Sequence, residues 1–423
     1  MAIADGSSGT RAARSAPRRR ALLAAAARSA PRRRALLAAA AMAGAVAAAG
    51  CSGSEAPGGS AATCSPTPPS PDDAFARERA PGSGDVALAR AIADRWIAEH
   101  PPESLPWDWG EGTIMLALVD LYRVTQHAPY RDHYLRYIDR HIERGYEITT
   151  SDRCPPAAAA LALHAETCAA RYGEVVGDVL HYLREEARRT EQGGINHLGV
   201  SPLFEPTLWV DSLFMFGNVL VRAGERAEGG RELDEFSGQY TLFASLLQDE
   251  PGLFRHAYNW ATPQDPGVYW ARGNAWVTAA GYEYLRARAA RGEQDGAVAG
   301  SLERQVAQIL RTQDPDTGLW WTIMNRPDEI YLETSATALF AVGLARGLRY
   351  GFLDASVRGA IERAMAGVRA RVVEDGAGRP VVTGISGPTS VGRLEDYARV
   401  ELRDDVSYGV GAVILALVET SGL

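Results

Sequence analysis

From Asp85 onward, apolar residues recur at intervals of three and four positions, which is the pattern of amphipathic helices. Turns rich in Gly, Pro and Asp separate these stretches, and only residues 379–383 indicate a short strand. The pattern predicts twelve helices, at about 85–100, 111–125, 130–145, 156–170, 173–189, 207–223, 232–247, 272–290, 297–312, 333–351, 355–372 and 405–420. A repeat of about 34 or 40 residues, the mark of a helical solenoid, is not visible. We therefore predict an all-α fold, an (α/α)6 barrel built from six antiparallel helical hairpins.

The first 51 residues have the composition of an export signal. A segment that begins at Arg14 is repeated identically from Arg28, and the second copy places three arginines before an apolar run from Ala35 to Ala49. Basic residues, then a short apolar run, then small residues are the order of a secretory signal. The ending Ala-Ala-Gly-Cys resembles a bacterial lipoprotein site with Cys51 as the lipidated residue, and a plain secretory signal or twin-arginine export is the alternative. We predict an exported chain, periplasmic or at the cell surface, that contacts the membrane only through this lipid.

Residues 52–84 are rich in Ser, Gly, Pro and Ala, and we predict a flexible linker between the anchor and a catalytic domain at 85–423. Cys154 and Cys168 would lie about 20 Å apart along one helix, too far for a disulfide. No Cys or His spacing indicates a metal site, and we expect neither a metal nor another cofactor. The net charge of −8 includes a basic first segment, so the body is more acidic still, which argues against a nucleic-acid partner.

The stretch from Trp209 to Trp276 carries the residues with the clearest chemical potential. Asp211 is the only charge between residues 207 and 221, and burial among apolar side chains would raise its pKa toward that of a general acid. The alternative is an Asp that stabilises a helix N-terminus. Arg272 lies close to Trp270, and this pair suits a carboxylate on a sugar ring, whereas ordinary core packing is the alternative. His256 adds a polar group between these two segments.

In a barrel of this kind the loops at one end gather polar and aromatic residues into a cleft. Most of the interesting residues precede or begin predicted helices: Trp109, Glu111, Asp152, His197, Asp211, His256, Trp270, Arg272 and Glu333. Helix N-termini favour anions, so an acidic sugar is the ligand that this arrangement predicts.

Several segments, in this order, resemble those of a known family. They are 109–112 (Trp-Gly-Glu-Gly), 209–215 (Trp-Val-Asp-Ser-Leu-Phe-Met), 252–256 (Gly-Leu-Phe-Arg-His), 270–274 (Trp-Ala-Arg-Gly-Asn), 317–320, 331–336 and 408–412. Together they span nearly all of residues 107–419. The chain resembles the unsaturated rhamnogalacturonyl hydrolases of glycoside hydrolase family 105 and the related unsaturated glucuronyl hydrolases of family 88.

The resemblance implies an (α/α)6 barrel without a metal and an unusual hydrolysis. Its substrate is a 4,5-unsaturated uronic acid, left at the non-reducing end of an oligosaccharide by a polysaccharide lyase. An acid protonates C4 of the enol ether, water adds at C5, and the hemiketal collapses to release the next sugar. By this resemblance Asp211 is the acid and then the base that activates water, and one carboxyl can serve both steps if it starts protonated.

The resemblance also assigns roles around Asp211. The family's second important Asp matches Asp152, for which helix capping is the alternative, since its flanking residues differ. His197 matches a family His, although the stretch that follows it is longer here, and His256 matches more closely. Arg272 and Trp270 would hold the substrate carboxylate and stack on the ring, and Trp109 would line the cleft. Glu333 receives no role beyond a possible helix cap.

The first hypothesis is therefore a hydrolase of unsaturated uronyl oligosaccharides, with rhamnogalacturonan fragments as the first substrate class. Glycosaminoglycan or ulvan fragments are an alternative, because the sequence gives no handle on the leaving sugar. A surface carbohydrate-binding lipoprotein that kept the barrel and lost activity is the second hypothesis. The third is another (α/α)6 enzyme, an epimerase or an ordinary glycosidase, and the glycosidase would need a second carboxylate about 5 to 9 Å from Asp211.

Overall fold

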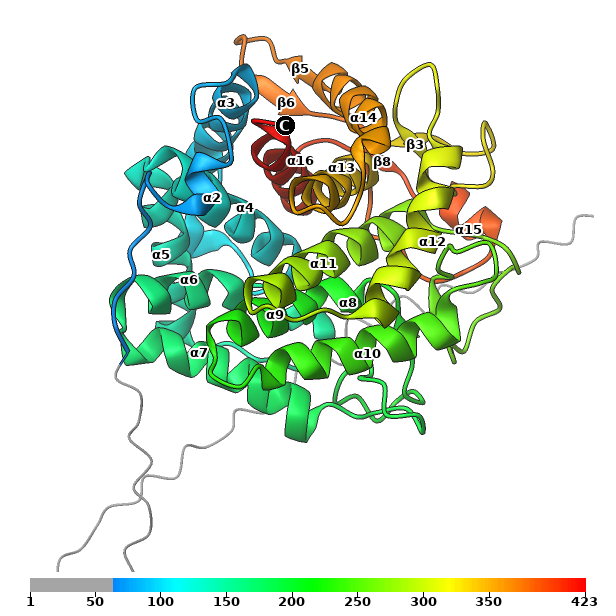
Figure 1. Ribbon diagram of the computed structural model, residues 1–423, viewed down its shortest axis with the longest axis horizontal. Helices are drawn as coiled ribbons and strands as arrows, with labels where there is room; N and C mark the ends of the chain where they lie inside the picture. The colour runs from blue at the N-terminus through cyan, green and yellow to red at the C-terminus, as the bar shows by residue number, and fades with distance from the viewer. Residues whose placement is uncertain (1–63) are drawn as a thin grey trace, which may run out of the picture. The chain divides into compact units, whose positions relative to one another are not determined.

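The computed structural model describes residues 64–423, and its longer helices alternate along the chain between two sets (Figure 1). The first set consists of α4 (Trp109–Thr125), α6 (Ala157–Thr167), α9 (Gly217–Arg226), α11 (Ala271–Ala290), α13 (Thr334–Arg349) and α16 (Ser407–Thr420). The second consists of α3 (Gly84–Glu99), α5 (Ala128–Arg144), α7 (Ala170–His181), α10 (Arg231–Leu247), α12 (Gly296–Thr312) and α14 (Arg358–Ala370). All twelve predicted helices are confirmed, although the sixth is divided into α8 (Ser212–Met215) and α9.

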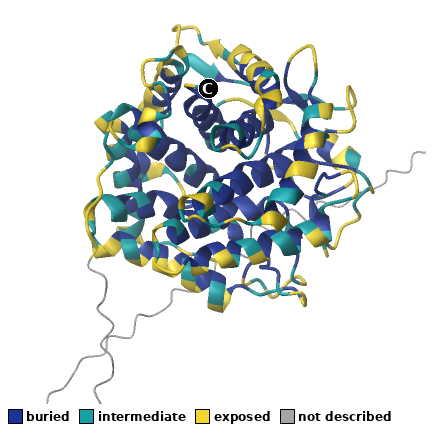
Figure 2. Ribbon diagram, viewed as in Figure 1, coloured by how far each residue is buried: buried dark blue, intermediate teal, exposed yellow. Residues whose placement is uncertain are grey.

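The first set forms the inner wall of a barrel and the second covers it. In α16 every residue from Tyr408 to Thr420 is buried, whereas α7 buries only one face. A helix that is buried on all sides must be surrounded by others, and the first set is dark blue in Figure 2. Its members contact one another in the closed order α4, α6, α9, α11, α13, α16 and again α4. The fold is the predicted (α/α)6 barrel.

The inner helices run parallel, so their N-termini meet at one end of the barrel. Two close approaches show this for α4 and α16: a Cβ on Gly110 would meet Ser407, and one on Gly411 would meet Ile114. The helices α11 and α13 are in register in the same way, with Gly343 against Thr278. The loops before the inner helices are therefore brought together.

Four two-stranded antiparallel sheets stiffen these connections. They are β1 (Leu208–Trp209) with β2 (Ala257–Tyr258), β3 (Trp320–Trp321) with β4 (Leu332–Glu333), β5 (Val372–Glu374) with β6 (Pro380–Val382), and β7 (Ile385–Ser386) with β8 (Leu402–Arg403). The strand β6 confirms the one predicted at residues 379–383. Two short helices, α2 (Ala74–Arg77) and α15 (Leu394–Ala398), complete the α-helices of the described residues. Within residues 64–423, none of the helices has the length and apolarity needed to cross a bilayer.

Residues 64–83, which the sequence places in the linker, instead pack on the barrel. Cys64 forms a disulfide with Cys168, and the N–H of Thr67 donates to the carbonyl oxygen of Ala165 (2.7 Å). Cys154 is free and buried, so the prediction that it does not pair with Cys168 is confirmed. The predicted signal segment and the lipidation site at Cys51 lie outside the described residues.

A chain of buried ion pairs crosses the end of the barrel opposite the inner N-termini. Arg222 on α9 lies 3.1 Å from Asp120 on α4 and 3.6 Å from Glu283 on α11. Arg346 on α13 lies 3.4 Å from Glu283 and 3.1 Å from Glu419 on α16. Each of these five side chains is less than 10% exposed. Buried charges persist only when they are paired, so this network fixes how five of the inner helices pack.

Candidate active site

The sequence motifs meet at the end of the barrel where the inner helices begin. Trp109 starts α4, Asp152 lies on the short helix η2 (Ser151–Arg153) before α6, and Asp211 directly precedes α8. Trp270 precedes α11, and Glu333 precedes α13. The predicted gathering of these segments at one end of the barrel is present.

Hydrogen bonds and close packing hold three of the motif segments together. The N–H of Val210 donates to the carbonyl oxygen of His256 (2.9 Å), next to the pairing of β1 with β2. The Asn274 side chain accepts from the N–H of Phe254 (2.8 Å) and donates to its carbonyl oxygen (2.9 Å). A Cβ on Gly273 would lie 2.6 Å from the Val210 side chain. Gly273 thus lets α11 pack closely against the segment that contains Asp211, and Asn274 binds α11 to the segment that contains Phe254.

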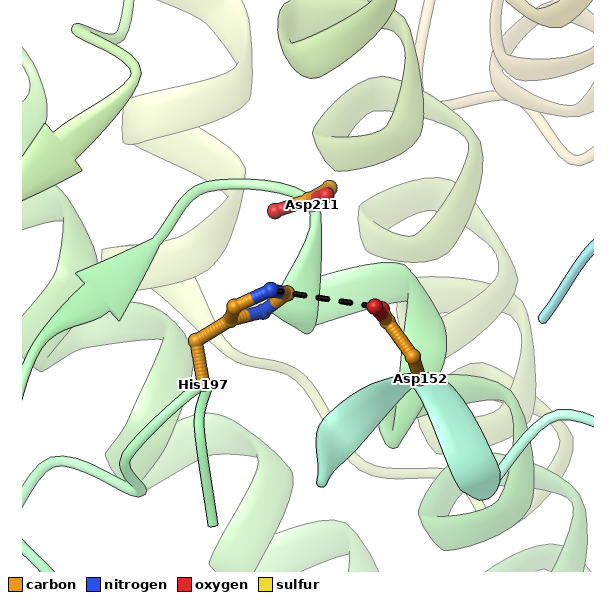
Figure 3. Close-up of side chains that lie close together, drawn as sticks. All are labelled: Asp152, His197 and Asp211. Carbon is orange, nitrogen blue, oxygen red and sulfur yellow. Dashed lines mark ion pairs between the residues drawn. The ribbon is translucent and has the colours of Figure 1, made fainter. Parts of the chain in front are cut away.

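Asp152, His197 and Asp211 form the polar centre of the site (Figure 3). The three side chains each place one polar atom within 4.8 Å of the other two. His197 Nε2 lies 3.8 Å from Asp152 Oδ2, and its Nδ1 is hydrogen-bonded to the hydroxyl of Ser212 (2.9 Å). The imidazole is thereby held in a fixed orientation beside both carboxyl groups.

The environment keeps these carboxyl groups protonated to a higher pH than usual. Asp211 is 9% exposed, and burial raises its pKa, although His197 and Arg272 favour its ionised form. Burial also raises the pKa of Asp152 to about 6; His197 opposes this, and the negative charge of Asp211 adds to it. Two carboxyl groups this close titrate as a pair, so they hold one proton between them in weakly acidic solution.

Neither Asp behaves as the helix cap that was the alternative for each. Asp211 has no capping hydrogen bond, and its Oδ1 is buried without a partner among the described residues. The caps of η2 and α6 involve no side chain from Asp152 either. A buried carboxyl that neither caps a helix nor has a hydrogen-bond partner lowers the stability of the fold, and this is typical of a functional position.

Aromatic side chains surround this centre. His197 is stacked on Trp209, with ring centroids 4.3 Å apart, and His256 is stacked on Trp270 at 4.3 Å. Trp109 packs against Tyr408 at 4.3 Å. The predicted residues Trp109, His197, His256 and Trp270 are therefore all present at this end of the barrel. Trp270 is only 3% exposed and is stacked on His256, so its stacking on a sugar ring stays a prediction.

His256 is a neutral imidazole in this setting. Burial, together with the charges of His197 and Arg272, lowers its pKa well below 6.5. Its Nδ1 is hydrogen-bonded to the hydroxyl of Tyr397 (2.8 Å), and its Nε2 is buried without a partner within residues 64–423. If the Tyr397 hydroxyl donates to Nδ1, Nε2 carries the proton and can donate to a ligand.

Arg272 is placed differently from the expectation. It is 1% exposed, and its Nη atoms donate to the carbonyl oxygens of Ser386 (2.9 Å) and Gly387 (2.9 Å) and to the Thr389 hydroxyl (3.1 Å). The guanidinium also lies 4.8 Å from the centre of the Trp270 ring. The structure shows Arg272 supporting the 386–389 loop, and a direct bond to a substrate carboxylate stays a prediction.

Glu333 caps a helix, as its position suggested. Its carboxylate accepts from the N–H of Ser335 (3.1 Å), from the N–H of Ala336 and from the N–H of Ser386 (2.9 Å). It also lies 3.8 Å from Arg272. Glu333 is 1% exposed, and these contacts join the start of α13 to the segment that contains Ser386.

Tyr397 is the residue that sequence reasoning missed. It lies on α15 and meets His256 from 141 positions further along the chain. The region around it has no regular apolar periodicity and matches none of the motifs, so no signal in the sequence pointed to it. Tyr397 also lines a pocket of about 300 Å³, together with Asp249, Arg255 and Asp265.

Asp152, His197 and Asp211 also have the side-chain types and the spacing that could hold a divalent cation. A structural zinc site has four protein ligands, whereas a catalytic one has three and a water, and this group supplies three. The proton shared by the two carboxyl groups would compete with a cation. The chemistry proposed below uses the two carboxyl groups and His197, and none of its steps requires a cation.

We therefore expect activity to be unaffected when the purified protein is incubated with excess EDTA and desalted. The measurement is the initial rate before and after this treatment, with metal content determined in parallel. A loss of activity that added Zn²⁺ or Mg²⁺ restores would contradict the metal-free site.

Comparison with known proteins agrees with this geometry. Residues 88–422 match the family model described as Glycosyl Hydrolase Family 88. The chain belongs to glycosyl hydrolase family 88. An unsaturated 3S-rhamnoglycuronyl hydrolase from Alteromonas sp. (strain LOR) is 28% identical over 217 residues, which are 50% of this chain and 50% of that protein. The family 88 chain thus spans about half the length of this curated relative.

Solved structures share the fold of this family 88 protein. A possible member of the GH105 family from Klebsiella pneumoniae superposes with a TM-score of 0.71 at 24% identity, covering 80% of this chain and 93% of the other. An unsaturated glucuronyl hydrolase from Bacillus sp. GL1 gives a TM-score of 0.63 at 17% identity, covering 79% and 95%. At these identities the likeness establishes the barrel and leaves the substrate open.

Proposed function

We propose that this protein removes a 4,5-unsaturated uronic acid from the non-reducing end of lyase-generated oligosaccharides, with rhamnogalacturonan-type fragments as the first substrate class. The proposal rests mainly on one observation: the carboxyl of Asp211 is buried, caps no helix and lies beside Asp152 and His197. Membership of family 88 favours a hydrolase over an inactive binding protein. The similarity to the unsaturated 3S-rhamnoglycuronyl hydrolase of Alteromonas supports a uronyl sugar linked to a rhamnose-type sugar.

In the proposed reaction the protonated carboxyl of Asp211 transfers its proton to C4 of the enol ether, and positive charge develops at C5 and the ring oxygen. Water attacks C5 and gives a proton back to the carboxylate of Asp211, while Asp152 and His197 orient it. The hemiketal opens by breaking the bond between C5 and the ring oxygen, which leaves a ketone at C5. The hemiacetal formed at C1 then expels the leaving sugar as an alcohol.

The test is the loss of the ultraviolet absorbance of the C4=C5 enol ether. Lyase digests of rhamnogalacturonan, heparinoid, chondroitin and ulvan form the panel, with release of the saturated sugar measured in parallel. We expect a loss of absorbance on at least one digest, in step with the release of that sugar. Release from saturated aryl glycosides without any loss on the panel would contradict the proposal and favour an ordinary glycosidase.

The activity should decline on the alkaline side of its pH profile. The first step needs the proton held by the Asp152–Asp211 pair, and burial raises the pKa of both carboxyl groups, that of Asp152 to about 6. We expect kcat/KM to fall as pH rises through this region. The measurement is kcat/KM between pH 4 and pH 9 with a substrate that does not titrate in this range. A constant value from pH 5 to pH 9 would contradict the proposed proton donor.

We further propose that the chain is exported and lipid-anchored through Cys51. The disulfide between Cys64 and Cys168 supports an oxidising compartment, because such bonds are uncommon in the cytosol. Fractionation of cells that express Cys51→Ser provides the test. The variant should leave the membrane fraction, and retention there equal to that of the wild type would contradict lipid attachment.

A further inference from the structure

The loop between His197 and Thr207 exposes an unusual group of apolar side chains. Leu203 is 70% exposed, and Val200 and Phe204 are each 37% exposed. Among residues 64–423, only Val373 and Leu402 are further large apolar side chains with such exposure. Apolar side chains that gather on one exposed segment indicate an interaction site.

An aromatic row connects this loop to the reacting pair. Phe204 packs against Trp260 with ring centroids 5.8 Å apart, and Trp260 meets the edge of Trp209 at 5.0 Å. Trp209 is stacked on His197, which lies 3.8 Å from Asp152. The Nε1 of Trp260 is buried without a partner in the described part of the chain. The row therefore leads from His197 and Asp152 to the exposed apolar loop.

The loop is held in place by its own contacts. Arg188 donates to the carbonyl oxygens of Ser201 and Phe204, both at 2.7 Å, and Asn259 donates to that of Pro206 (3.0 Å). Gly199 has φ +57°, and a Cβ there would lie 2.1 Å from the carbonyl oxygen of Thr149. A surface fixed in this way loses little conformational entropy when a ligand binds.

The charge of the loop restricts which sugar it accepts. Glu205 is its only ionisable side chain and is exposed, and the nearby cation Arg188 is bonded to loop carbonyl oxygens. A sulfate or carboxylate on the bound sugar would meet the like charge of Glu205, and the Nη1 group of Arg188 is already bonded to two loop carbonyl oxygens. Leucine and aromatic faces instead match the C–H face of a neutral sugar and the methyl group of a 6-deoxyhexose.

We propose that Leu203, Phe204 and Trp260 form the binding surface for the leaving sugar, and that this surface selects an uncharged sugar with an apolar face, such as a 6-deoxyhexose. The inference rests on the proposed function, because it takes the reacting bond to lie beside Asp211 and Asp152. In this proposal the 198–206 loop selects the leaving sugar, whereas the residues around Asp211 bind the uronic acid.

The test compares two substrates of the full chain: a disaccharide of the unsaturated uronic acid with a 6-deoxyhexose, and the methyl glycoside of the same acid. Leu203→Ser and Phe204→Ala, separately and together, are compared with Val373→Ala, another exposed apolar position, on β5. In the double variant, the ratio of kcat/KM between disaccharide and methyl glycoside should fall about tenfold, mainly through KM. Val373→Ala should leave the ratio unchanged.

An unchanged ratio in the double variant would overturn the inference. An equal loss of kcat/KM on both substrates would also overturn it, because the loop would then only support the reacting residues.

The 3-sulfated form of the disaccharide should have a lower kcat/KM than the unsulfated form, and Glu205→Gln should reduce this difference in kcat/KM. Equal turnover of both forms by the wild type would overturn the proposed selectivity. If the wild type turns over neither substrate, the proposed function fails, and calorimetric binding of the disaccharide decides the inference: about tenfold weaker binding to the double variant supports it, and equal binding overturns it.

Discussion

Asp211→Asn should lower kcat/KM by about four orders of magnitude while leaving the fold intact. Asn has nearly the same shape as Asp, and Asp211 makes no capping hydrogen bond that the change would remove. The amide cannot donate a proton to C4 and cannot accept one from water, so both proposed steps are lost. General acid–base catalysis contributes about 10² to 10⁴ in rate, and one residue that serves two steps should reach the upper end of this range.

The measurement is the rate of absorbance loss on the best substrate of the panel, with circular dichroism and melting temperature to verify the fold. Asp316→Asn is the matched control, because Asp316 lies in an exposed turn and is not one of the residues assigned to the site. Its activity should equal that of the wild type. Near-normal turnover by Asp211→Asn would remove Asp211 from the chemistry and leave Asp152 as the acid.

Glu283→Ala should destabilise the protein by about 3 to 5 kcal/mol, because it breaks a buried ion-pair network by removing one partner. Glu283 is 5% exposed and lies between Arg222 and Arg346, which are 8% and 4% exposed. Without its carboxylate these two guanidinium groups would remain buried close to each other with fewer countercharges. Burial raises the pKa of Glu283, but Arg286, Arg346 and Arg222 outweigh burial and hold it well below 4.5.

Urea denaturation followed by circular dichroism measures this loss. Glu395→Ala, which removes the partner of Arg399 in a pair that is mostly exposed, is the control and should leave the denaturation midpoint unchanged. Because the pKa of Glu283 is lowered in the folded state, its contribution is fully present above the pKa of the unfolded chain and declines as pH falls below it. An equal midpoint for Glu283→Ala and the wild type would contradict a stabilising network.

The helices were predictable because each has a local signal. Apolar spacing, Gly and Pro turns and helix length placed all twelve, and the number of hairpins then indicated the barrel. The division of the sixth helix at Phe216 was not foreseen, because the apolar run through it is continuous. The packing of residues 64–83 was hidden for another reason: their Ser, Gly and Pro content is that of a linker, and the partner of Cys64 lies 104 residues away.

The site was predictable as a set of motifs and only partly as a geometry. The apolar run around Asp211 correctly indicated burial, which raises its pKa. The motif did not reveal what Arg272 binds. An Arg two residues after Trp270 can bind a ligand, but it can equally donate to the carbonyl oxygens of Ser386 and Gly387, as it does here. Tyr397 could not be found at all, because its contact with His256 joins segments far apart in the sequence.

The central claim is that the double bond itself is the target, and the fate of C4 tests it most directly. The best substrate is turned over in D₂O, and the released uronic acid product is followed by NMR from the first turnovers. The account predicts one deuterium at C4 in the first product, with loss of the vinyl proton signal at the same rate as the leaving sugar appears. Release of that sugar with the C4 vinyl proton still in place would show cleavage at C1 by ordinary hydrolysis and would contradict the account.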